Sequence, residues 1–135
     1  MRRSPAATFT VLAATQFFGF AAGIADAATH DGPAGLEVRL PDVADQPVAE
    51  DDVAAALLHV VEDRPSDTTL ELAGPDRMRL PASVAAGLAA QGDPRPVLVD
   101  PAATYFGATV TADELLPGPG AVLGVVHHRD WLARR

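Results

Sequence analysis

Cysteine and lysine are both absent from this chain of 135 residues. Without cysteine there is no disulfide, no zinc–thiolate site and no thiol nucleophile. Without lysine, these residues cannot carry a mechanism that needs an ammonium group, a Schiff base or a Tyr-x-x-x-Lys pair. Aromatic residues make up only 5% of the chain, so any core has to be built mostly from small aliphatic side chains.

Positive charge is also scarce. Ten basic residues, all arginine, stand against eighteen acidic ones and give a net charge of −8. A nucleic-acid-binding surface needs a basic footprint, so nucleic acid is not an expected partner. The hydrophobic content of 48% is that of a globular protein, and the length suits a single domain.

The first 27 residues allow three interpretations. Arg2 and Arg3 precede an uncharged run from Pro5 to Ala25, and small residues follow, as in a secretory signal. The run is long enough for a transmembrane helix, but its alanines and glycines make it only mildly apolar. Residues 8–12 are β-branched and aromatic, which suits a parallel strand buried on both faces and followed by a helix. From the residues alone, signal and strand fit this segment equally well.

The rest of the chain predicts alternating strands and helices, which indicates an α/β protein. The clearest helix spans residues 51–62, where Glu50, Asp51 and Asp52 place negative charge at the N-terminal end of the helix dipole. Its apolar face comprises Val53, Leu57, Leu58, Val60 and Val61. A loop is expected at 30–35, strands at 36–40, 68–73 and 97–99, a second helix from Pro81 to Gly92, and a short last helix near 130–132.

Two groups of residues are of the types found in functional sites, but the sequence around them does not fit such a site. The glycines of segment 118–124 faintly resemble a dinucleotide fingerprint, but they lie among prolines near the end of the chain, so a turn is predicted. His127, His128 and Asp130 are metal-ligand residue types, but no further cluster completes a site. A solvated start of a helix is predicted there instead.

Four residues after the first predicted strand are the best site candidates: Thr15, Gln16, Phe17 and Phe18. In open α/β sheets, ligands bind beyond the carboxyl ends of the strands, which is where these side chains are expected.

Residues 10–20, TVLAATQFFGF, resemble the segment TILRATQFFEF of NmrA-like reductases, which are atypical short-chain dehydrogenase/reductases. Further fragments similar to that family follow in the same order: Gln46–Ala49 with 51–56, Glu71–Pro75, Gly92–Arg95, Asp100–Pro101, Tyr105–Gly107, Leu116–Gly118 and Asp130–Ala133.

The resemblance implies a fold. The chain would be the C-terminal portion of a doubly wound, Rossmann-like parallel sheet, with a small C-terminal region that closes over substrate and with the N-terminal cofactor-binding half absent. Residues 1–135 would form a single partial domain, in which 8–75 supply the last strands and helices and 76–135 the substrate side. Residues 8–12 become a strand, so the resemblance favours the strand over the secretory signal.

The resemblance also implies a function, which is NAD(P)-dependent reduction of a small-molecule substrate by a cytoplasmic protein. Thr15 and Gln16 are expected to bind the cofactor. The substrate pocket is expected to include Phe17, Phe18, Tyr105 and Phe106. The family's glycine-rich fingerprint and Tyr-x-x-x-Lys pair do not occur in this sequence, so catalysis by this chain alone is not expected, and binding of NAD(P) by it alone is in question. Two residues depart from the family pattern: Ala13 replaces an arginine, and His128 replaces a phenylalanine.

Two alternatives stay open. One is a regulator that senses a dinucleotide without turnover, and the other is a small secreted protein if residues 1–27 are a signal. For the reductase-like chain we expect no membrane and no nucleic-acid partner. Because its first strand would lack a neighbour, we expect self-association or pairing with a separate N-terminal half.

Overall fold

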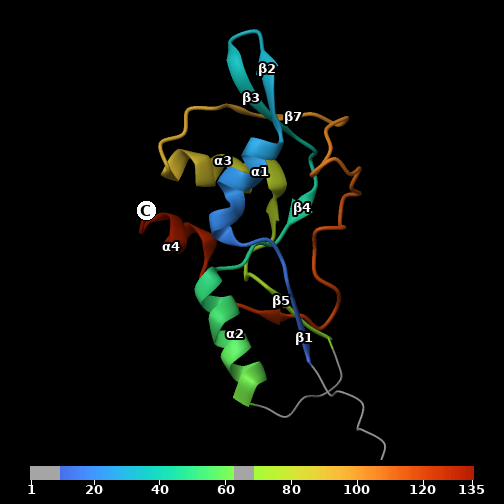
Figure 1. Cartoon of the computed structure of the whole chain (residues 1–135), viewed down its shortest axis with the longest axis vertical. Helices are drawn as coiled ribbons and strands as arrows, with labels where there is room; N and C mark the ends of the chain where they lie inside the picture. Colours follow the sequence, from blue (N-terminus) through green and yellow to red (C-terminus); the bar gives the residue numbers. More distant parts are fainter. Residues whose placement is uncertain (1–9, 63–68) are drawn as a thin grey trace, which may run out of the picture.

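The computed structural model describes residues 10–62 and 69–135, which form an α/β fold (Figure 1). One sheet is parallel throughout and has the order β1-β5-β8. Its strands are β1 (Val11–Ala14), β5 (Thr69–Ala73) and β8 (Val122–Leu123). The parallel pairing of β1 and β5 agrees with the predicted α/β organisation, whereas β8 was not predicted.

β1 begins later than the strand predicted at 8–12, of which residues 8 and 9 lie outside the described part of the chain. The shift extends the strand over Ala13 and Ala14, because these residues pair with β5 despite their low strand propensity. Among the described strands β1 pairs only with β5, and Val11, Ala13 and Ala14 are exposed. The expected burial of this strand on both faces is therefore wrong for the part of the chain described.

A second sheet, of order β2-β3-β7, lies at the other end of the molecule (Figure 1). β2 (Thr29–Gly32) and β3 (Gly35–Leu40) form an antiparallel hairpin, and β7 (Val97–Val99) runs parallel to β3. The strands predicted at 36–40 and 97–99 are confirmed. The loop predicted at 30–35 is wrong over most of its length, because these residues complete the hairpin, with Gly35 at a φ of 121°.

Shorter elements complete the fold. β4 (Ala44–Asp45) pairs antiparallel with β6 (Met78–Arg79). The helical elements are η1 (Phe18–Phe20), α1 (Ala21–Ala27), α2 (Glu50–Glu62), α3 (Leu80–Ala90) and α4 (His128–Leu132). The helix predicted from Pro81 to Gly92 is confirmed as α3, with Pro81 in its first turn and Gly92 just beyond its end at a φ of 72°.

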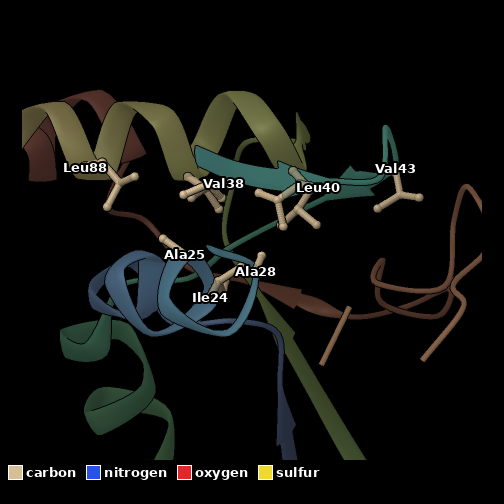
Figure 2. Close-up of a cluster of buried hydrophobic side chains, with 9 residues drawn as sticks. Ile24, Ala25, Ala28, Val38, Leu40, Val43 and Leu88 are labelled. Atoms are coloured by element: carbon tan, nitrogen blue, oxygen red, sulfur yellow. The ribbon is translucent and has the colours of Figure 1, made fainter. Parts of the chain in front are cut away.

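The hydrophobic core lies between α1, α3 and β3 (Figure 2). Its fully buried members include Ala25 of α1, Val38 and Leu40 of β3, and Leu80 of α3. Small residues let the two helices approach closely, because a Cβ at Gly87 would lie 2.5 Å from the Cβ of Ala21. The core is therefore built from small aliphatic side chains, as the scarcity of aromatic residues predicts.

α2 confirms the helix predicted at 51–62, but its apolar face is not buried. Leu57, Leu58 and Val61 are 47%, 59% and 79% exposed. The buried residue of α2 is instead Asp52, whose carboxylate accepts hydrogen bonds from the backbone N–H groups of Val125 and Val126, both at 3.0 Å. These hydrogen bonds thus anchor the N-terminal end of α2, while its apolar face stays exposed.

Each of the two larger sheets combines strands from before and after residue 75. β8 pairs with β5 in one sheet, and β7 pairs with β3 in the other. α1 packs against α3. Ile24 and Ala25, which fall within the alternative secretory signal of residues 1–27, belong to the core, so removal of that segment would open the core. No helix in the described ranges is long and apolar enough to cross a membrane.

Candidate functional site

The carboxyl end of β1 is held by hydrogen bonds to two other segments. Thr15 donates its backbone N–H to the carbonyl oxygen of Leu72, at 3.0 Å. Its hydroxyl donates to the carbonyl oxygen of Gln46, at 2.6 Å. Thr15 therefore fixes the end of the strand, and its hydroxyl is already engaged.

The next residues are fixed by Val48. The Val48 N–H donates to the carbonyl oxygen of Gln16, and the Phe18 N–H donates to the carbonyl oxygen of Val48, both at 2.8 Å. This bridge leaves the side chains of Gln16 and Phe17 at the surface of the strand end.

Gln46 and Gly74 form the support beneath them. The Gln46 side-chain amide donates to the carbonyl oxygen of Gly74, at 2.9 Å. A Cβ at Gly74 would lie 1.7 Å from the carbonyl oxygen of Pro47, so only glycine fits here. Both positions belong to fragments that resemble the NmrA-like family, although their supporting role has no local signature in the sequence.

Two shallow hollows flank the strand end. One, of about 260 Å³, is lined by Ala14, Thr15, Gln16, Phe17 and Phe20. The other, of about 230 Å³, shares Ala14–Gln16 and adds Ala13, Glu71, Leu72 and residues 114–117. Each is slightly smaller than a typical ligand pocket of roughly 300–1,000 Å³. We call the two together the strand-end groove.

Gln16 is the polar centre of this groove. Its side chain is half-buried and makes no hydrogen bond to any other residue in the described ranges. A primary amide offers two donors and one acceptor oxygen. The amide is therefore free to bind a ligand that has complementary polar atoms.

Aromatic rings form one wall of the groove. Phe17 and Phe20 are both exposed, and the ring of Phe106 lies 6.0 Å from that of Phe20, with 31° between their planes. Exposed aromatic rings close to one another are unusual in a chain with so few of them, and they suit a flat, apolar ligand.

Phe106 reaches this position through a strained turn. The backbone of Tyr105 and Ala108 is joined by hydrogen bonds in both directions, at 2.8 and 3.0 Å. Between them, Phe106 has a φ of 49° and Gly107 a φ of 81°, so both central residues are left-handed. A bulky residue in this conformation is uncommon, and such strain is often found at functional positions.

The structure brings some predicted site residues together and separates others. Thr15, Gln16 and Phe17 line the groove, and Phe106 adjoins it through Phe20. Phe18 is buried, and its ring packs at 4.9 Å from that of His128 and 5.5 Å from that of Trp131. Tyr105 packs against the core, with its hydroxyl buried.

The polar side of the groove is acidic. Glu71 lies in it and accepts a hydrogen bond from the Gly118 N–H at 2.7 Å, and Glu114 lines the same hollow. No arginine is among the residues that line the two hollows. Phosphate groups would therefore be repelled here, whereas an uncharged ligand would not.

The histidines near the C-terminus do not form a metal site. His127 lies 3.0 Å from Asp76 through its Nδ1 atom, and the His128 N–H donates to the same carboxylate at 3.1 Å. Partial burial raises the pKa of Asp76, but these hydrogen bonds outweigh it and hold the pKa below its usual value. Within the described ranges there is no group of three or more residues that could hold a metal ion. The predicted solvated helix start is wrong for His128, which is buried among aromatic rings because α4 packs onto Phe18.

Sequence reasoning missed Phe20, Glu71 and the supporting pair Gln46 and Gly74. Phe20 was signalled only as the last residue of the TQFFGF segment. Glu71 enters the groove because β5 pairs with β1, which no local pattern in the sequence reveals.

Neither a protein-family model nor a curated protein matches this sequence. The groove itself offers a half-buried amide, exposed aromatic rings and two carboxylates to a ligand.

Proposed function

We propose that this chain is the substrate side of an NmrA-like, NAD(P)-dependent reductase fold, and that the strand-end groove holds the nicotinamide end of the cofactor next to a small carbonyl or quinone substrate. The observation that carries the proposal is the amide of Gln16, which has no hydrogen-bond partner among the described residues and lies beside exposed phenylalanines at the carboxyl end of a parallel strand. Ligands of open α/β sheets bind at this position.

The groove residues fit a nicotinamide ring. The Gln16 amide can exchange hydrogen bonds with a carboxamide, and the rings of Phe17 and Phe20 can pack against a flat heterocycle. A bound NAD(P)H would supply the hydride. The residues of this chain would bind and orient the ring and keep water from it. Ala13, where the family has an arginine, also lines the groove and leaves more room there.

The groove residues do not fit the phosphates of a dinucleotide. Glu71 and Glu114 make the polar side acidic, and no arginine lines it. We propose that the remainder of the cofactor is held by strands added at the edge of β1 that has no partner among the described strands, from a separate N-terminal half or another chain. The doubly wound sheet and a cytoplasmic location belong to this same proposal, and both rest on the sequence resemblance.

A regulator without turnover is the second candidate. The observation that favours it is the exposed apolar face of α2, which carries Leu57, Leu58 and Val61. A contiguous apolar surface of this kind is typical of a site for another protein. In that case, a ligand in the groove would alter association with the partner rather than react.

A titration followed by ¹H–¹⁵N NMR tests the groove. We would add a small water-soluble quinone, and in a second series nicotinamide, to the chain. Because the chain has no cysteine or lysine, a quinone has no thiol or ammonium side chain to modify. We expect saturable shifts at Thr15, Gln16, Phe17, Phe20 and Phe106.

Variants sharpen this test. Gln16→Ala removes the free amide and should weaken nicotinamide binding by about fivefold, the equivalent of one hydrogen bond. Leu36→Ala, at the exposed tip of the β2–β3 hairpin, is the control and should change nothing. A separate, apolar hollow beside α4 is lined by Met78, Ala86 and Leu132. Shifts centred on that hollow, or no saturable shifts at all, would contradict the proposal.

A further inference from the structure

Asp45 is a carboxyl group buried deep in the fold. It is the last residue of β4 and is 1% exposed. Its Oδ1 atom accepts a hydrogen bond from the Gln46 N–H at 2.9 Å, and its Oδ2 atom lies 3.4 Å from the hydroxyl oxygen of Ser83. Such isolation from water is costly for a charged group unless it is well paired.

The hydrogen bonds around Asp45 are best satisfied when its carboxyl group is protonated and neutral. The Ser83 hydroxyl oxygen also lies 3.1 Å from the carbonyl oxygen of Leu80. Its single proton cannot serve both acceptors at once. If Asp45 is protonated, it donates to Ser83 while Ser83 donates to Leu80, and every group is satisfied. Burial raises the pKa of Asp45 to about 6, because desolvation outweighs the hydrogen bonds from Gln46 and Ser83.

Residues 100–121, which we call the arm, run beside this carboxyl group: burial and the nearby charge of Asp45 both raise the pKa of the Tyr105 hydroxyl in the arm. The arm runs along one side of the molecule without a helix or strand (Figure 1). The Ala44 N–H, next to Asp45, donates to the carbonyl oxygen of Ala112 at 2.9 Å. Tyr105 of the arm packs against the core, and its buried hydroxyl has no hydrogen-bond partner in the described part of the chain. The arm therefore lies beside Asp45 and is hydrogen-bonded to the adjacent Ala44, without a polar bond from Tyr105.

Few other charged groups face Asp45. Ser83 comes from α3, Tyr105 from the arm and His128 from α4, and His128 lines the same small cavity as Asp45. Burial lowers the pKa of His128, so this ring is neutral near pH 7. From β6, Arg79 turns its guanidinium outward to a surface carboxylate. Among the residues that the structure describes, no cation therefore compensates a negative charge on Asp45.

We propose that Asp45 and the Tyr105 arm form a pH-sensitive latch: the arm is closed while Asp45 is protonated, and it opens as Asp45 ionises and becomes hydrated. The latch goes beyond the proposed reductase function and does not require any ligand. Opening would also remove Phe106 and residues 114–117 from the strand-end groove, so it would regulate whatever binds there.

The size of the effect follows from proton linkage. The carboxyl titrates near pH 6 in the closed form and near its ordinary value of 3.8 when hydrated in the open form. The closed form is therefore favoured at low pH and loses stability as pH rises from 3.8 to about 6, above which there is no further change. A difference of two pH units changes the ratio of open to closed molecules by about 100-fold.

The arm can open without unfolding the core, because other elements also cover the core. Leu80, Val84 and Leu88 of α3 pack with α1 and β3, as Figure 2 shows for Leu88. The arm adds Tyr105 and two further partly buried side chains at the margin of this cluster. Its departure leaves the contact between α1 and α3 in place.

Hydrogen exchange of the complete chain tests the latch. Rates at the Ala44 and Ala108 amides, which are hydrogen-bonded in the closed form, would be divided by the intrinsic rates at each pH. Between about pH 4 and pH 7 we expect their protection to fall by up to about 100-fold. Protection of the α3 amides should stay constant. A flat profile at Ala44, or a parallel fall in α3, would overturn the proposal.

Three variants separate the contributions. Asp45→Asn should abolish the pH dependence, whereas Asp42→Asn, at a neighbouring exposed carboxylate, should retain it. Tyr105→Phe removes the unpaired hydroxyl, so it should raise arm protection at every pH and keep the slope. This variant preserves the ring and the fold, so it remains informative if Asp45→Asn does not fold. An Asp45→Asn profile that still falls with pH, or a Tyr105→Phe arm that is less protected, would refute the latch.

Discussion

The ring of Phe18 meets the imidazole of His128 edge-on, with 4.9 Å between their centroids and 64° between their planes. This contact joins the segment after β1 to α4, and Trp131 packs against both rings. A histidine here acts as an aromatic core residue. The NmrA-like pattern that the sequence resembles has a phenylalanine at the same position.

His128→Phe should therefore make the protein less sensitive to acid. Burial lowers the pKa of His128, so the folded state favours the neutral ring. The unfolded chain takes up a proton as pH falls below about 6.5, and the stability due to His128 is lost in that range. We expect the free energy of unfolding of the variant to exceed that of the wild type more at pH 5 than at pH 8. Denaturant unfolding at both pH values measures this, with His59→Phe on the exposed face of α2 as the control. An equal difference at the two pH values would argue against a neutral buried His128.

Asp52→Ala should destabilise the protein far more than Asp51→Ala. Asp52 accepts the N–H groups of Val125 and Val126, and its loss leaves both without a partner. Hydrogen bonds to a charged group contribute about 1.5–3 kcal/mol. Asp51 is exposed and contributes only through the helix dipole, about 0.3–1 kcal/mol. Chemical denaturation at neutral pH compares the two, and equal losses would show that the contact with residues 125–126 is unimportant.

The elements predicted correctly are those with local signals. Acidic residues at the start of α2, Pro81 at the start of α3 and Gly92 after it act within a turn of the chain, so the sequence displays them. β4, β6 and β8 have two residues each, too few to show a strand period. They exist because partners distant in sequence supply the hydrogen bonds.

The residues of the candidate site could likewise be predicted only where the signal in the sequence is local. Residues 15–17 could be placed at the end of a strand, because ligands of α/β proteins bind there. That Phe18 and Tyr105 turn their rings inward could not be predicted, because α4 and the core decide it. The apolar face of α2 was recognised correctly in the sequence, but periodicity cannot tell whether a partner within the chain covers it.

The chain alone should show no oxidoreductase turnover. Hydride transfer needs a bound carrier and an acid. The sequence has neither the glycine-rich fingerprint nor a Tyr-x-x-x-Lys pair, and the buried Tyr105 hydroxyl does not reach the groove surface. We expect no oxidation of NADH or NADPH above a heat-treated control with small quinones and carbonyl compounds, followed by absorbance. Turnover that Gln16→Ala abolishes would show that this groove is catalytic without further strands.

The free edge of β1 and the apolar face of α2 should make the isolated chain associate. β1 has one strand neighbour within the described chain, and an open strand edge pairs readily with another chain. Leu58 and Val61 of α2 add exposed apolar surface. Sedimentation velocity should show the mean mass rising from low to high micromolar concentration.

Leu58→Lys and Val61→Lys identify the surface responsible. Lysine is a good helix former, so α2 should persist, which circular dichroism would check. Each substitution places a charge where apolar contact is needed, so both should shift the chain toward monomer. Leu36→Lys, at the similarly exposed tip of the β2–β3 hairpin, should leave association unchanged. If all three variants and the wild type are monomeric throughout, with one cooperative melt above about 60 °C, the upper range of mesophile domains, the open edge and the α2 face need no partner. The chain would then be stable by itself, and the proposal that further strands join at β1 would lose its main support.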